Sequence, residues 1–201
     1  MPAFLATALL FMLAIGGCRA DAAPDDSDAP EVTLQDFQRV AGTPVLTADL
    51  GARVTSESSR GRSSYSDPSG ATVNVLFYDT EARQGRWLFP SNAARILDRR
   101  DVTAGETDTR AVVYTVVARD TDGDEQLTAR DERSLVVVSP DGTGRRTLVE
   151  RFDSDLGDFR VSPEAVVFTY AFEGQPAAVE LNLADLSSRA VALPRVPGVD
   201  A

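Results

Sequence analysis

The chain has 201 residues, of which 43% are hydrophobic and 25% charged, a balance typical of one folded domain with a substantial core. The net charge of −11 argues against nucleic-acid binding, which needs clustered cations. The absence of His excludes Ser-His-Asp and Cys-His catalysis and His-ligated zinc, and the absence of Lys excludes Schiff-base chemistry. A hard cation with oxygen ligands, such as calcium, is the kind of metal that this composition can bind.

The first two segments of the chain are predicted to be a leader and a tether. The uncharged apolar run over residues 3–15 suits the hydrophobic region of a secretory signal peptide, and it is short for a membrane-spanning helix, which needs about 20 apolar residues. The single cysteine, Cys18, follows this run, so no intramolecular disulfide can form. Residues 18–31 are acidic and contain Pro, which predicts a flexible tether.

The sequence Ile15-Gly16-Gly17-Cys18 resembles the lipobox of bacterial lipoprotein precursors. The resemblance implies that residues 1–17 are a removable signal peptide, that Cys18 carries a lipid, and that the mature chain is anchored to a membrane of the bacterial cell envelope. Because Arg19 rather than Asp follows the cysteine, the resemblance further implies the periplasmic face of the outer membrane. The alternative is an ordinary secretory signal with an incidental cysteine.

Residues 32–195 alternate short apolar runs with turn signals, which predicts an all-β domain of antiparallel hairpins. Residues 32–40 fit a strand or a short helix, and the Ser- and Arg-rich residues 60–70 fit a surface loop. Residues 71–79 and 84–89 predict a hairpin with Phe77, Trp87 and Phe89 in the core. Further strands are predicted at 111–118, 134–139, 146–150, 165–172, 178–183 and 190–193, with a tail at 196–201.

A degenerate repeat is visible in residues 74–89, 135–149 and 179–193: an apolar strand, a polar turn, an Arg and a short apolar strand. Such spacing suggests four-stranded propeller blades. The segments 138–148 and 161–168 resemble the strand-turn-strand and Ser-Pro-Asp-Gly elements of WD40-like repeats of the TolB β-propeller type. The resemblance implies a partial β-propeller used for binding or scaffolding. A β-sandwich and a unit that closes by self-association are the alternatives.

The most chemically specific stretch is the acidic segment 120–131, whose spacing is that of a twelve-residue calcium loop. The predicted metal ligands are Asp120, Asp122, Asp124, Gln126 through its carbonyl, Thr128 through water, and Asp131. The segment resembles EF-hand loops and is closer to those of dockerin-like modules because it ends in Asp. It differs at Glu125, where Gly is usual, and at Asp131, where a bidentate Glu is usual. The alternative is an acidic hairpin tip whose carboxylates pair with surface arginines.

Two functions from different classes fit this sequence. The first is a non-enzymatic envelope lipoprotein whose β-domain contacts an envelope protein or a cell-wall component, with calcium ordering one loop. The second is a carboxylate-dependent hydrolase such as a glycosidase, because Asp and Glu are the remaining acid-base groups. The spacing of the carboxylates singles out no catalytic pair. Glu164, Glu173 and Glu180 are predicted to be solvated strand or turn residues.

Overall fold

A computed structural model describes residues 32–52, 71–105, 107–195 and 197. The predicted leader with Cys18, the tether, the loop at 60–70 and most of the tail lie outside the described residues. The described part is all-β and antiparallel, as the sequence predicts, and contains no helix. Its strands are β1 (Val32–Leu34), β2 (Gln38–Arg39), β3 (Val45–Ala52), β4 (Ala71–Asp79), β5 (Gln84–Trp87), β6 (Arg95–Ala104), β7 (Asp108–Val117), β8 (Arg133–Val138), β9 (Arg146–Phe152), β10 (Ser154–Ser162), β11 (Ala165–Phe172), β12 (Gln175–Asn182) and β13 (Ser188–Val191).

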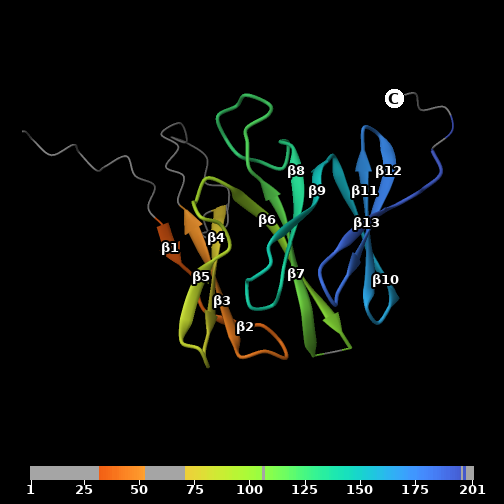
Figure 1. Ribbon diagram of the computed structural model, residues 1–201. Helices are drawn as coiled ribbons and strands as arrows, with labels where there is room; N and C mark the ends of the chain where they lie inside the picture. The colour runs from red at the N-terminus through yellow and green to blue at the C-terminus, as the bar shows by residue number, and fades with distance from the viewer. Residues whose placement is uncertain (1–31, 53–70, 106, 196, 198–201) are drawn as a thin grey trace, which may run out of the picture.

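The strands form three meanders that stand side by side (Figure 1). In the first layer β1 and β2 both pair with β3, which pairs with β4, which pairs with β5. The second layer is β6-β7-β8-β9 and the third is β10-β11-β12-β13. The first two layers form one nine-stranded sheet through a single register pair, Thr72 with Ile96. The described stack is open at both ends, an arrangement consistent with a partial propeller or a sandwich.

The second layer is buried on both faces. Ala111 and Val113 of β7 belong to a core shared with the third layer, whereas the alternating Val112 and Tyr114 belong to a core shared with the first. Side chains of a strand point alternately to the two faces of its sheet, so both faces of β7 must be apolar. This double burial is the reason that β7 appears in the sequence as a continuous apolar run rather than an alternating one.

The three segments that repeat in the sequence occupy equivalent places in the three layers. They coincide with the hairpins β4-β5, β8-β9 and β12-β13, each formed by the last two strands of its meander. Two strands precede this hairpin in the second and third layers, and β1, β2 and β3 precede it in the first. The repeated pattern therefore marks the last two strands of each layer.

The structure corrects one predicted core residue and supplies strands that the sequence pattern did not predict. Phe77 is buried and Phe89 is partly buried, but Trp87 is 47% exposed. Trp87 pairs with Leu76 on the face of β4 opposite Phe77, so it points away from the core. β3, β6 and β10 were not predicted from the sequence, and in β6 and β10 charged residues interrupt the apolar positions.

Candidate metal centre in the acidic loop

The acidic segment connects two central strands of the second layer. Val117 at the end of β7 pairs with Arg133 at the start of β8, so residues 118–132 form one hairpin loop. In Figure 1 this loop projects beyond the strand ends. A hairpin needs about two to five loop residues, so most residues of this loop are not needed to connect the strands and can form a binding site.

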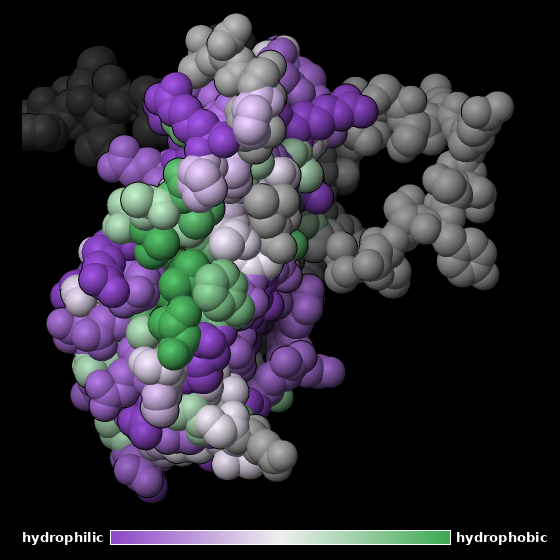
Figure 2. All heavy atoms as spheres, turned by 90° about the vertical axis from the view of Figure 1, so that its right-hand side faces the viewer, coloured by the Kyte–Doolittle hydropathy of each residue, from purple (hydrophilic) through white to green (hydrophobic). Residues whose placement is uncertain are grey.

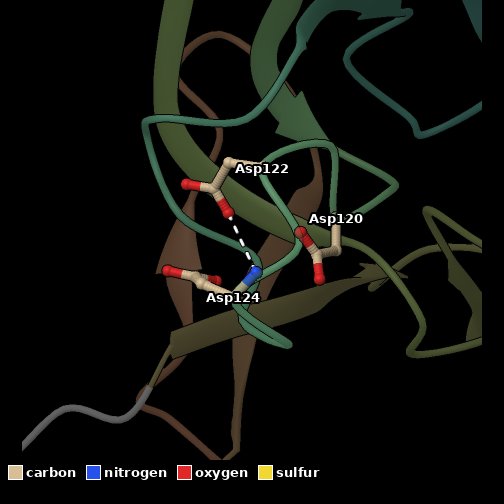
Figure 3. A group of neighbouring side chains, drawn as sticks. All are labelled: Asp120, Asp122 and Asp124. Atoms are coloured by element: carbon tan, nitrogen blue, oxygen red, sulfur yellow. Dashed lines mark hydrogen bonds between the residues drawn. The ribbon is translucent and has the colours of Figure 1, made fainter.

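Three of the four predicted aspartate ligands lie together in the first half of the loop. Carboxylate oxygens of Asp120, Asp122 and Asp124 all lie within 4.8 Å of one another, and the three residues are exposed (Figure 3). Oxygen ligands around a calcium ion lie at about 2.3–2.6 Å from it, so oxygens with this separation fit one coordination sphere. The alternating spacing in the sequence therefore produces the convergence of side chains that a cation site requires.

The loop backbone holds these carboxylates in place. The amides of Gly123 and Glu125 donate to the two oxygens of Asp120, at 2.7 and 2.8 Å. The Asp124 amide donates to Asp122 at 3.2 Å, as Figure 3 shows, and the Gln126 amide donates to Asp124 at 2.9 Å. Asp side chains commonly bind backbone groups a few residues further along a turn. The same carboxylates thus bind the backbone of the loop and lie close to one another.

Glu125, at the position where calcium loops usually have Gly, has a positive φ. Glu125 has a φ of +62°, in the left-handed region, and Gly123 has a φ of +79°. This conformation costs a non-glycine residue about 1–2 kcal/mol. The departure from the usual loop sequence therefore adds backbone strain at Glu125.

Asp131 lies apart from the cluster and closes the base of the loop. It is only 3% exposed. Its Oδ1 accepts hydrogen bonds from the amide (2.6 Å) and hydroxyl (3.1 Å) of Thr121 and from the Asp122 amide (3.3 Å), and its Oδ2 accepts one from the Thr128 amide (2.7 Å). The backbone amides of Thr121 and Thr128 are the main reason that the pKa of Asp131 falls to about 2.

The two predicted non-carboxylate ligands also take part in holding the loop. The Gln126 amide binds Asp124, and the Thr128 hydroxyl accepts from the Arg130 amide at 3.1 Å. Metal contacts through the Gln126 carbonyl and through a water on Thr128 stay predictions. Arg95 of β6, which no local sequence pattern singles out, donates to the Leu127 carbonyl at 2.7 Å and connects the loop to the neighbouring strand.

The electrostatics of this aspartate cluster favour a positive ligand. The pKa of Asp122 is raised, first by desolvation of its carboxyl group and then by the negative charges of Asp124, Asp131 and Asp120, despite the hydrogen bond from the Asp124 amide. Like charges this close disfavour full ionisation, and an opposite charge reverses that effect. A bound divalent cation would stabilise the ionised form of all three exposed aspartates.

A polar groove lies between the loop base and the turn joining β11 to β12, and it contains the carboxylates of Glu132 and Glu173. Both form ion pairs with Arg151, at 3.2 Å each. A glycosidase acid needs a setting that disfavours its ionised form, such as an apolar pocket or a neighbouring like charge. Glu132 and Glu173 are instead exposed and share Arg151 as an ion-pair partner.

A scan against protein-family models gives no match for this chain, and a search of curated proteins gives none either. Among the described residues, no helix is long and apolar enough to cross a membrane.

Proposed function

We propose that this chain is a non-enzymatic lipoprotein of the bacterial cell envelope whose layered β-domain binds or scaffolds another envelope component, with calcium ordering the acidic loop. The observation that carries the ion site is the convergence of Asp120, Asp122 and Asp124 within 4.8 Å. The support for the anchor is the sequence Ile15-Gly16-Gly17-Cys18, together with the acidic tether that follows it.

The role proposed for calcium is structural. The loop has backbone hydrogen bonds of its own, so the ion is not needed to define the turn. Its contribution is to neutralise three clustered charges and to stiffen a long connection between β7 and β8. A ligand that binds the folded state stabilises it by RT ln(1 + [L]/Kd). Exposed sites in extracellular modules have Kd values of about 10⁻⁴–10⁻³ M, so 10 mM calcium would stabilise the domain by about 1.4–2.7 kcal/mol.

Calorimetric titration of the full chain with calcium chloride tests the site. The wild type is expected to bind one ion with a Kd of about 10⁻⁴–10⁻³ M. The double variant Asp120→Asn/Asp124→Asn should lose measurable binding, because two of the three clustered carboxylates become neutral. Asp36→Asn is the matched control, since Asp36 is exposed and lies outside the cluster. Equal calcium heats for the wild type and the double variant would disprove the site.

The anchor has its own test, in which wild type and Cys18→Ser are compared by fractionation of bacterial cells. The wild type is expected in the detergent-soluble membrane fraction and the variant in the soluble periplasmic fraction. Retention of Cys18→Ser in the membrane fraction would contradict lipidation at that residue and would leave the calcium site unaffected.

A further inference from the structure

A cleft of about 450 Å³ opens between the first and second layers, and its lining contrasts with the acidic character of the chain. The chain has a net charge of −11, and the face shown in Figure 2, at the third-layer end, is mostly covered by hydrophilic side chains. The described residues that line the cleft include Arg145 and Arg146 but no Asp or Glu. Two other clefts of the described chain both contain Glu132. The cleft is therefore a local site of positive charge on an acidic protein.

The floor of the cleft is apolar. Val116 of β7 and Val136 of β8 line it, are 2% and 6% exposed, and belong to the core between the first and second layers. Ala94, in the connection between β5 and β6, packs against the same core. An apolar floor of this kind binds the hydrocarbon part of a ligand, because the contact removes apolar surface from water. The volume of the cleft lies in the range of about 300–1,000 Å³ that is usual for small-molecule sites.

One wall of the cleft is the connection between β5 and β6, and a buried asparagine holds this wall in place. Asn74 of β4 is 2% exposed. Its Nδ2 donates to the carbonyls of Phe89 (3.0 Å) and Ser91 (3.3 Å) and to Oδ1 of Asn92 (3.0 Å). Its Oδ1 accepts a hydrogen bond from the Phe89 amide at 3.0 Å. The wall is thus positioned without a ligand, and a preformed site loses less conformational entropy on binding.

Arg145, immediately before β9, is held in the lining of the cleft by two contacts. Its Nη1 donates to the Leu88 carbonyl at 2.6 Å, and its guanidinium lies over the Phe89 ring, 5.2 Å from the centroid. A guanidinium has several N–H donors in a planar fork, which matches the oxygens of a carboxylate or a phosphate. The bond to Leu88 uses one of these donors, so others can bind an anion in the cleft.

Arg146, the first residue of β9, is a second cation in the lining. Its Nη1 donates to the Leu186 carbonyl at 3.4 Å. Arg146 also interacts electrostatically with Asp185, a carboxylate outside the cleft lining. Because Asp185 offsets part of the charge of Arg146, we expect Arg145 to contribute more to anion binding.

We propose that this cleft binds a small organic anion, with its charged head group on Arg145 and Arg146 and its apolar part on Val116 and Val136. The ligand class follows from the lining. Two guanidinium groups beside a buried apolar floor accept a carboxylate or a phosphate that is joined to a compact hydrocarbon body. The predicted calcium ligands do not line the cleft, so this site depends neither on calcium binding nor on the lipid anchor.

Calorimetric titration of the full chain in a non-ionic detergent tests the ligand class, with the heats of the detergent buffer subtracted. The probes are 3-phenylpropanoate and phenyl phosphate, the neutral 3-phenylpropanamide, and acetate, which lacks the ring. The aromatic anions are expected to bind with Kd values of about 0.1–1 mM, and the tighter of them identifies the head group. The amide and acetate should bind at least about tenfold more weakly, because each lacks one of the two contacts. Equal affinity for 3-phenylpropanoate and its amide, or no binding of either aromatic anion at about 10 mM, overturns the proposal.

Variants of the arginines locate the binding in this cleft. Arg145→Gln/Arg146→Gln should raise the Kd of the tighter anion at least about tenfold, and Arg145→Gln alone should raise it more than Arg146→Gln alone. Arg110→Gln is the matched control, because Arg110 is exposed on β7, pairs with Asp108 at 2.7 Å and lies outside the lining. It should leave the Kd unchanged, and far-UV circular dichroism establishes that each variant keeps its β-structure. An unchanged Kd in the double variant disproves the site. Should that variant lose its β-structure, Arg145→Gln alone decides in the same way.

Discussion

Removing the hydroxyl of Tyr114 should stabilise the protein. Tyr114 lies on β7 between the first and second layers, is fully buried, and its hydroxyl has no hydrogen-bond partner among the described residues. Desolvation raises the pKa of this hydroxyl, although the nearby charge of Arg99 acts in the opposite direction. A buried hydroxyl without a hydrogen bond costs about 1–3 kcal/mol.

Tyr114→Phe keeps the ring that packs in the core and removes one oxygen. We take the lower end of the range because the Arg99 guanidinium, which donates to Thr47 Oγ1 at 2.7 Å, supplies favourable electrostatics near the hydroxyl. The free energy of unfolding should therefore rise by about 1 kcal/mol, and Tm by about 2–4 °C. Urea denaturation followed by far-UV circular dichroism measures the change.

The control is Tyr170→Phe, because Tyr170 is only partly buried and packs edge-on against Phe152 at 6.2 Å between ring centroids. Loss of its hydroxyl should change stability by less than about 0.5 kcal/mol. If Tyr114→Phe instead destabilised the domain by about 1 kcal/mol or more, the Tyr114 hydroxyl would have a hydrogen-bond partner in solution, contrary to the prediction.

Two further predictions concern a glycine in a turn and the buried carboxylate Asp131. Gly142 has a φ of +79°, and a Cβ added there would lie 2.6 Å from Cγ of buried Phe77. Gly142→Ala should therefore lower the free energy of unfolding, measured in urea, by about 2–5 kcal/mol. Gly123→Ala is the control, because Gly123 has the same φ but open space around it, and it should lower that free energy by about 1–2 kcal/mol. Because Asp131 has a folded pKa of about 2, below its ordinary 3.8, its ionised form stabilises the fold above pH 4, and this contribution disappears as the pH falls towards 2. The stability difference between wild type and Asp131→Asn should shrink over that interval; a constant difference from pH 5 to pH 2 would contradict the hydrogen bonds from Thr121.

Local sequence determined the elements whose signal lies within a few residues. The apolar run at β7 predicts a strand. The alternating aspartates that follow it predict a loop with clustered carboxylates. Asp120 and Asp124 bind amides two to five residues away, so their positions follow from the chain nearby. Asp131 was also singled out, but its burial and its position outside the cluster depend on how the loop base folds.

The tertiary structure decided which strands lie together and which faces are covered. The charged residues of β6 are typical of an exposed segment and do not predict a strand. In the structure, Arg100 of β6 forms an ion pair at 3.2 Å with Asp158 of β10, which lies 58 residues away in the sequence. The large aromatic side chain of Trp87 is of a kind that usually packs in a core, but its pairing with Leu76 places it on the outward face of the sheet. Side-chain alternation fixes two faces for every strand, and only the stacking of distant layers selects which of them is buried.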